Sequence, residues 1–161
     1  MSGKPKEPMR SILIDRRWSV AMPEHRANRP GWSFWEQERL SYMWTVIRPG
    51  DVVWEIGAEQ GDISALYALW GANVVLVEPD GGFWPNIRRI FETNGVADQV
   101  AGTFHGFVGP KADPSTSCPL VEGVWPGCVL GPSTKDRYPV SIANNDPGQR
   151  TTLDAMLDMF P

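Results

Sequence analysis

The stretch that decides the fold is residues 52–61, which read VVWEIGAEQG and are followed by DISALYALWG over residues 62–71. Residues 52–56 are a short, mostly apolar run of the kind that forms a buried strand, and Gly57 closes it. The apolar residues of the second stretch recur at i, i+3, i+4 and i+7, the spacing of one helix face: Ile63, Leu66, Tyr67 and Trp70. The sequence therefore predicts a strand, a glycine turn and an amphipathic helix that ends at Gly71.

The same order repeats toward the C-terminus. Residues 74–77, VVLV, predict a second buried strand, and the helix that we expect over residues 83–94 ends at an Asn-Gly pair. Residues 100–108 predict a third strand, interrupted by two glycines. Strands that alternate with helices at this spacing are typical of parallel βαβ units. We therefore expect an α/β fold with a Rossmann-like, mostly parallel sheet and helices on both faces.

Toward the N-terminus the pattern changes. Residues 11–14 and 18–21 predict two short strands, a small β element before the main sheet, and residues 23–30 read as a loop. From Phe34 the apolar residues return to helical spacing, and Pro49-Gly50 ends that helix. We expect three tryptophans to pack this helix against the sheet: Trp32, Trp35 and Trp44.

The C-terminal third is less regular. Residues 109–137 are rich in Gly, Pro, Ser and Thr without periodicity, which predicts an irregular insert of the kind that often forms a lid or binding loop. Residues 138–143 predict one more strand, and Thr151 is placed to cap a last helix. The apolar face of that helix would consist of Leu153, Met156, Leu157 and Phe160. The whole chain, residues 1–161, is expected to form one domain with an N-terminal extension over residues 1–32.

Charge is divided unevenly along the 161 residues. Residues 1–50 carry nine Lys and Arg against five Asp and Glu, whereas residues 51–161 carry six against fourteen. An acidic body argues against broad nucleic-acid binding, which needs basic side chains to displace counterions from phosphates. The basic N-terminal third could attract an anionic partner, or could be an ordinary solvated surface.

We expect a cytoplasmic protein with no membrane association. The apolar runs are far shorter than the roughly 18 residues of a membrane-spanning helix, and no apolar run follows the N-terminus as in a signal peptide. The two cysteines are Cys118 and Cys128, and the two histidines, His25 and His105, lie far from them in sequence. Reduced thiols and no metal site are therefore expected.

The glycine turn is the first candidate for a binding site. Gly57 and Gly61 stand four apart, and the middle glycine of the dinucleotide-binding pattern G-x-G-x-x-G is absent. Glu55 and Glu59 lie in or beside the turn, and their negative charges would repel a pyrophosphate. These carboxylates suit a positively charged ligand, such as the sulfonium and ammonium groups of S-adenosylmethionine. The alternative is a tight turn that binds no ligand.

Glu78, at the end of the second predicted strand, is the second candidate. It follows Gly57 by 21 residues, near the roughly 20 expected between a glycine turn and a ribose-binding acid. Its carboxylate can accept hydrogen bonds from both ribose hydroxyls, and such an acid is expected to contribute little to the core. This arrangement serves NAD as well as S-adenosylmethionine, and the acidic turn favours the latter. A strand-end acid that faces solvent is the alternative.

Residues 48–64 and 71–80, followed by a helix that ends at residues 94–96, resemble the motifs of the FkbM-type class I methyltransferases. That family typically has a strand ending in Asp-x-Gly-Ala-Asn-x-Gly, then Glu-Pro-Asp, then a helix ending in Asn-Gly. Residues 152–154, Thr-Leu-Asp, are similar to its Thr-Leu-Asp helix. The resemblance implies a class I methyltransferase fold and the transfer of a methyl group from S-adenosylmethionine to a hydroxyl oxygen of a small molecule or sugar.

The resemblance also implies roles for individual residues. The turn would line the methionine half of the cofactor, and Glu78 would hold the ribose. Asp80 and Phe83 would flank the adenosine, and Phe107 or Val108 would contact the adenine. The candidate cofactor-binding residues are Glu55, Gly57, Ala58, Glu59, Gly61, Glu78, Pro79, Asp80, Phe83 and Phe107.

Two of these residues depart from the family's pattern. Glu55 stands where aspartate is usual and Glu59 where asparagine is usual, so cofactor affinity could differ. No catalytic residue is assigned. His105 could serve as a general base for a hydroxyl acceptor, or could be a structural histidine beside a strand.

The resemblance further implies an incomplete sheet. Class I enzymes usually build seven strands, and the sequence shows about four of parallel type. The family's next strand, which ends in an acidic motif beside the transferred methyl group, would begin where residues 158–161 stand. We therefore expect a truncated or reduced enzyme, with weak or absent activity. A homodimer or the 109–137 insert would cover the open sheet edge.

Three other functions stay open at this point. The first is an NAD-dependent oxidoreductase, which the turn disfavours. The second is a non-catalytic module that retains the cofactor site of such a methyltransferase. The third is a protein-interaction domain that uses the Trp-rich, basic N-terminal region.

Overall fold

A computed structural model describes residues 7–109 and 149–157 of the chain. The strand expected over residues 138–143, nearly all of the 109–137 insert, both cysteines and Phe160 lie outside these residues. In the described part, the order of elements is mixed α/β, as the sequence predicts. Within that part, no helix is long and apolar enough to cross a membrane.

A three-stranded parallel sheet lies at the centre of the molecule. It consists of β3 (Val52–Ile56), β4 (Asn73–Val77) and β5 (Val100–Phe104), in the order β3-β4-β5. Both pairs are parallel: β3 and β4 pair in continuous register, with Ile56 opposite Val77, and the register of β4 with β5 shifts between Val74 and Val75. This confirms the first two strands predicted from the apolar runs, and the first part of the third. Among the described residues the outer edge of β3 is unpaired, and the homodimer expected to cover such an edge stays a prediction.

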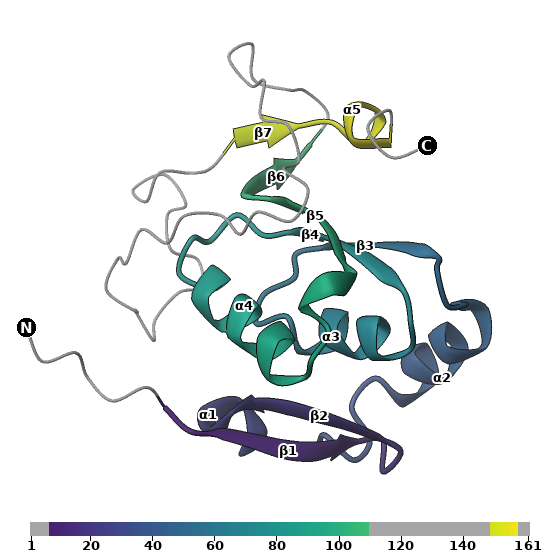
Figure 1. Cartoon of the computed structure of the whole chain (residues 1–161), viewed down its shortest axis with the longest axis vertical. Helices are drawn as coiled ribbons and strands as arrows, with labels where there is room; N and C mark the ends of the chain where they lie inside the picture. Colours follow the sequence, from purple (N-terminus) through teal and green to yellow (C-terminus); the bar gives the residue numbers. More distant parts are fainter. Residues whose placement is uncertain (1–6, 110–148, 158–161) are drawn as a thin grey trace, which may run out of the picture.

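The helices α3 (Asp62–Leu69) and α4 (Trp84–Thr93) follow β3 and β4 and pack against one face of this sheet (Figure 1). The sequence predicts one apolar face for α3, but every residue from Asp62 to Ala68 is buried. A second layer therefore covers the side of α3 that the sheet leaves open. Residues of α3 outside the predicted apolar face, such as Ser64, Ala65 and Ala68, are small enough to fit beneath that layer.

That second layer is the antiparallel hairpin of β1 (Met9–Ile14) and β2 (Trp18–Pro23). Figure 1 shows the hairpin, the helices and the parallel sheet as three successive layers. Both strands were predicted, but the loop expected over residues 23–30 contains a one-turn helix, α1 (Glu24–Ala27). The side-chain amide of Asn94, at the end of α4, accepts from the Ala21 N–H and donates to the Ala21 carbonyl, each at 2.8 Å. The Asn-Gly pair predicted as a helix cap thus also fixes the hairpin onto α4.

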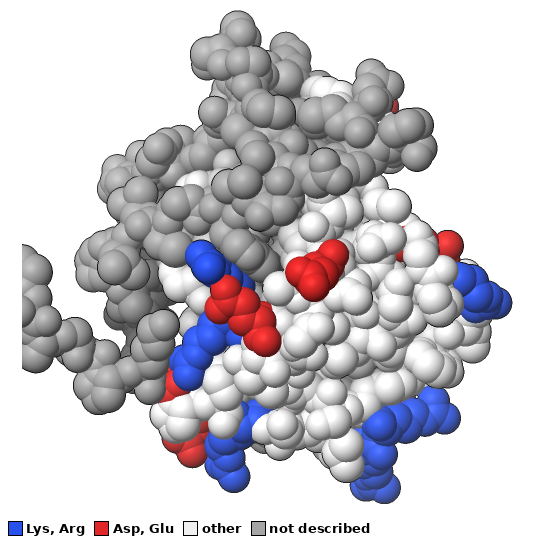
Figure 2. All heavy atoms as spheres, viewed as in Figure 1, with Lys and Arg blue, Asp and Glu red and all other residues white. Residues whose placement is uncertain are grey.

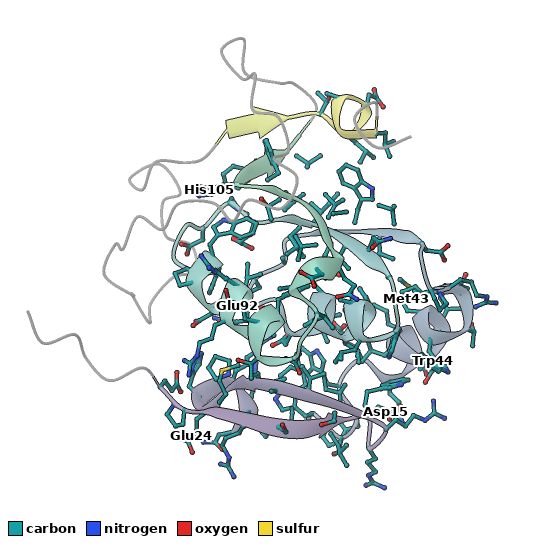
Figure 3. The ribbon with its side chains drawn as sticks, in the orientation of Figure 1. Asp15, Glu24, Met43, Trp44, Glu92 and His105 are labelled. Atoms are coloured by element: carbon teal, nitrogen blue, oxygen red, sulfur yellow. The ribbon has the colours of Figure 1, made fainter. Side chains whose placement is uncertain are left out.

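The helix α2 (Gln37–Val46) begins three residues later than Phe34, where the sequence places its start. Figure 3 shows Met43 and Trp44 on α2, at the side of the molecule next to the hairpin. The Trp44 ring contacts Trp18 of β2 and Trp70 at the end of α3, with centroids 6.0 and 5.2 Å apart. Trp44 therefore packs α2 against β2 and the end of α3, and its packing against the parallel sheet stays a prediction.

The third predicted strand, residues 100–108, is two strands rather than one. β5 ends at Phe104, and β6 (Gly106–Val108) pairs in parallel with β7 (Gln149–Thr151) in a separate sheet. The last helix, α5 (Leu153–Leu157), is capped by Thr152, whose Oγ1 accepts the Ala155 N–H at 3.2 Å, and not by Thr151. In the described part, α2, α3 and α4 share one face of the main sheet, while β6, β7 and α5 lie beyond the other (Figure 1).

The basic N-terminal third lies largely on the hairpin layer. In Figure 2, Lys and Arg side chains project from the lower edge of the molecule, over the hairpin, and others lie on the left of this face next to acidic side chains. Several are paired with acids: Arg10 with Glu24 at 3.4 Å, and Arg39 with Glu36. These surface pairs agree with the solvated-surface interpretation of the basic third.

Candidate functional site

The glycine turn and the strand end predicted as a site lie side by side. β3 and β4 are parallel neighbours, so their carboxyl ends meet at one edge of the sheet, where ligands bind in open α/β folds. The Val77 carbonyl at the end of β4 accepts hydrogen bonds from the N–H groups of Gly57 and Ala58, at 2.8 and 2.9 Å. These two bonds fix the turn over residues 57–61 against the β4 end.

The backbone N–H groups of this turn are used within the protein. Besides Gly57 and Ala58, Glu59 donates to Glu78 Oε2 at 2.8 Å, and Gly61 donates to the Ala58 carbonyl at 2.8 Å. A dinucleotide-binding turn instead directs its N–H groups and the helix N-terminus at a pyrophosphate. Four of the five N–H donors of residues 57–61 are therefore engaged within the protein.

The two glycines of the turn have different roles. Both have positive φ angles, 84° at Gly57 and 81° at Gly61. A Cβ on Gly61 would lie 3.0–3.2 Å from atoms of Ile87 on α4, so this glycine is needed for close packing of the turn against that helix. A Cβ on Gly57 would meet no atom within 4 Å. Gly57 therefore borders open space at the strand end, where a ligand could approach the backbone.

Glu78 is held more tightly than the sequence suggests. Its side chain is buried, with a residue exposure of 5%. Oε1 accepts the Asp80 N–H at 2.7 Å and Oε2 accepts the Glu59 N–H at 2.8 Å, so the carboxylate links the turn to the loop after β4. Burial raises its pKa to about 7, although the two backbone hydrogen bonds act in the opposite direction. Each oxygen has a second lone pair, which leaves acceptor capacity for a ligand hydroxyl.

Glu55, the last charged residue of β3, is half-buried. Its pKa is raised to about 7, chiefly by burial. The negative charges of Asp62 and Glu36 add to this rise, and the positive charge of Arg39 opposes it. In the described part, no hydrogen bond is made to its carboxylate. Glu55 is therefore a desolvated acid whose acceptor oxygens a cationic or hydroxyl-bearing group could use.

Glu59 extends from the turn itself. It has a φ of 48°, an uncommon angle for a residue with a side chain, and its side chain is 41% exposed. Its Oε2 lies 3.4 Å from Nη2 of Arg26, a residue of α1 in the hairpin layer. Arg26 also donates to Asp62, the first residue of α3. Sequence reasoning missed both Arg26 and Asp62, because no local pattern connects a loop arginine to a helix 36 positions later.

The loop after β4 is stabilised by its own side chains. Asp80 Oδ1 accepts the Gly82 N–H at 2.7 Å, and the Pro79 carbonyl lies 3.0 Å from His105 Nε2, which must donate to it. Pro79 and Asp80 both lie in the loop that directly follows the end of β4. Phe83 is partly buried and packs against the main hydrophobic core, and its place beside the adenosine stays a prediction.

His105 separates β5 from β6, and Figure 3 shows it where the chain leaves the main sheet. Its ring contacts Trp84 at 6.4 Å between centroids, and its Nε2–H holds the Pro79 carbonyl. These contacts orient the ring, and they leave the lone pair of Nδ1 unused, so both the structural and the general-base interpretation of His105 stay predictions. Phe107, expected to contact the adenine, lies in β6 opposite Arg150 of β7, in the second sheet; the adenine contact stays a prediction.

Comparisons with known proteins found no matching family model, no matching curated protein and no matching solved structure. Among the described residues, no group of three or more His, Cys, Asp or Glu side chains is arranged to hold a metal ion. What the chain does must therefore be argued from the carboxyl edge of β3 and β4.

Proposed function

We propose that the chain binds S-adenosylmethionine at the carboxyl ends of β3 and β4 and belongs to the class of enzymes that methylate a hydroxyl oxygen of a small molecule or sugar. The observation that carries the proposal is the hydrogen bond from the Glu59 N–H to Glu78 Oε2, 2.8 Å long. It joins the glycine turn to the strand-end acid, the two segments on which the resemblance to FkbM-type methyltransferases rests.

The chemistry of the residues at this edge fits such a ligand. Gly57 leaves room for a ligand at the strand end, and the engaged N–H groups offer little to a pyrophosphate. Glu55 and Glu59 supply negative charge for an ammonium and a sulfonium group. Glu78 retains lone pairs for ribose hydroxyls. When bound, the cofactor would supply an electrophilic methyl group on a positively charged sulfur.

The residues of the chain would act mainly by orientation. Displacement at a sulfonium methyl depends on alignment of nucleophile, methyl group and sulfur more than on strong acid–base assistance. The bonds that fix the turn to Val77 and Glu78 provide a rigid surface for such alignment. His105 donates through Nε2 to the Pro79 carbonyl, which would orient its ring and leave Nδ1 as the nitrogen with a lone pair.

Calorimetric titration of the full chain with S-adenosylmethionine, S-adenosylhomocysteine and NAD tests the proposal. We expect both adenosyl ligands to bind and NAD to bind at least tenfold more weakly. Binding of NAD alone, or of no ligand, would contradict the proposed cofactor. A methyl-transfer assay with hydroxyl acceptors then separates an enzyme from the non-catalytic module, which would bind the cofactor without turnover.

A further inference from the structure

The hairpin layer reaches the glycine turn through a buried arginine. Arg26 lies in α1, and its Nε donates to Asp62 Oδ2 while its Nη2 lies 3.4 Å from Asp62 Oδ1. Both side chains are almost fully buried, 9% exposed for Arg26 and 4% for Asp62. A buried charge keeps its ionised form only when a partner compensates for lost water, so the two residues form a fixed unit.

The same guanidinium also reaches Glu59. Its Nη2 lies 3.4 Å from Glu59 Oε2, well beyond the roughly 2.7–2.9 Å of a strong charge-assisted hydrogen bond. Arg26 is thus firmly paired with Asp62 and loosely paired with Glu59. One planar guanidinium can serve two carboxylates because its donors point along a rigid fork.

Arg26 is itself held in place from the hairpin side. Its guanidinium carbon lies 5.3 Å from the centroid of the Trp32 ring, and Trp32 Nε1 donates to the Arg26 carbonyl at 2.9 Å. The side chain is therefore oriented before any ligand arrives, which is the requirement for a residue that positions another.

We infer that Arg26 is a positioning residue of the candidate site, which acts through Glu59 by holding its carboxylate beside the turn while leaving it accessible to a cationic ligand. The inference rests on the proposed function and deepens it. The N-terminal extension is then part of ligand recognition, because Arg26, which positions the Glu59 carboxylate, belongs to α1.

A change of Arg26 to lysine isolates the positioning role. Lysine keeps the positive charge, so Asp62 retains a partner, but a compact ammonium cannot span both carboxylates as the fork does. Glu59 is then free and must be ordered when a ligand binds. For Arg26→Lys we expect the affinity for the sulfonium S-adenosylmethionine to fall about fivefold and that for the uncharged thioether S-adenosylhomocysteine by about twofold or less.

A double-mutant cycle with Glu59→Gln tests whether Arg26 acts through Glu59. In the Glu59→Gln background, Arg26→Lys should no longer alter the ratio of the two affinities. If Arg26 had a merely structural role, Arg26→Lys would lower the affinities for both ligands by the same factor, with Glu59 or Gln at position 59. That result overturns the inference. The matched control is Arg10→Lys, since Arg10 pairs with Glu24 and Asn28 in the same hairpin layer. It should leave both affinities unchanged.

A ligand-free measurement completes the test. The Glu59 amide proton is bonded to Glu78, so its hydrogen exchange reports how well the turn is held. Arg26→Lys should raise its exchange rate about tenfold, whereas Arg10→Lys should not. An unchanged rate in Arg26→Lys overturns the positioning role. Where the unaltered chain binds neither adenosyl ligand, the proposed function fails, and the exchange rate still decides whether Arg26 positions Glu59.

Discussion

β3 and β4 are neighbouring strands of similar apolar composition, yet they have different environments. In β4, the four residues from Val74 to Val77 are buried, whereas β3 exposes Val52 and Ile56 at 47% and 52%. The cause is position in the sheet, since β4 pairs with β3 on one side and β5 on the other. Within the described residues β3 pairs on one side only. An apolar run thus predicts a strand, but the neighbours of that strand decide how much of it is buried.

The same difference extends to the carboxylates near the ends of these strands. Glu78 follows β4 and accepts two backbone hydrogen bonds, while Glu55 in β3 accepts none from the described part of the chain. Burial nevertheless raises both pKa values to about 7. One acid therefore supports the local structure, and the other is desolvated without hydrogen-bonded support. The following predictions test this contrast.

The largest difference is expected from truncation of apolar side chains on the two strands. Leu76→Ala removes a fully buried side chain from β4 and should lower the free energy of unfolding by about 3 kcal/mol. Ile56→Ala removes a half-exposed one from β3 and should cost only about 0.5 kcal/mol. Denaturant unfolding of both variants measures the difference. Equal costs would mean that the β3 edge is covered in solution, as by the expected homodimer.

Removal of the two carboxylates should follow the same order, with a larger loss of stability at the end of β4 than in β3. Glu78→Ala leaves the N–H groups of Glu59 and Asp80 without their acceptor and should cost about 2 kcal/mol of unfolding free energy. Glu55→Ala removes a desolvated charge and should leave stability unchanged or raise it by about 1 kcal/mol. Urea unfolding at pH 7 compares the pair. A Glu78→Ala protein as stable as the unaltered chain would show that water replaces the lost acceptor.

The cost expected for Glu78→Ala corrects the sequence-based view that this acid contributes little to the fold. Its position at the strand end was predictable from the 21-residue interval after Gly57. Its two hydrogen bonds were not, because they depend on how the turn folds back over the end of β4. Similarly, the acidic character of the turn was predictable, but the contact of Arg26 with Asp62 and Glu59 joins segments that are far apart in sequence.

For the fold, periodicity located the main sheet and its helices because each element repeats a local pattern of apolar residues. It did not predict the burial of α3 on all sides, which depends on the hairpin that covers it. Nor did it predict the break at His105, which lies between β5 and β6 and bonds the Pro79 carbonyl. These features arise from packing between distant segments, about which a single sequence window carries no information.

The raised pKa values predict a pH dependence of stability. Below pH 4.5 the folded and unfolded carboxyls are both protonated, and between pH 4.5 and about 7 the folded ones retain protons that the unfolded ones have lost. Unfolding then releases protons, so the free energy of unfolding falls as the pH rises through this interval. We expect a loss of roughly 2 kcal/mol from Glu78 and about 1 kcal/mol from the more solvent-screened Glu55.

Unfolding measured at pH 5, 6 and 7 for the unaltered chain, Glu55→Gln and Glu78→Gln separates the two contributions. Each substitution should remove its own part of the slope, because glutamine does not titrate. If neither variant alters the slope, both carboxyls are ionised in the folded protein at pH 5, and the burial of the two strand ends has less electrostatic effect than we expect.

A small effect on stability, but a specific effect on the candidate site, is expected from Gly57→Ala. Gly57 follows β3 directly and has a φ of 84°, so alanine there should cost about 1 kcal/mol through backbone strain. Its Cβ would meet no protein atom within 4 Å and would project into the space where we place the ligand. The affinity for S-adenosylmethionine, measured by calorimetry, should therefore fall at least tenfold.

Gly95→Ala is the matched control for this substitution. Gly95 has a φ of 70°, and a Cβ there would also meet no atom within 4 Å, but it lies after α4 rather than after β3. The strain should lower the unfolding free energy by a similar amount, about 1 kcal/mol, without a change in affinity. If both variants lose affinity equally, the loss comes from reduced stability. If only Gly57→Ala loses it, the open space at the end of β3 is where the ligand binds.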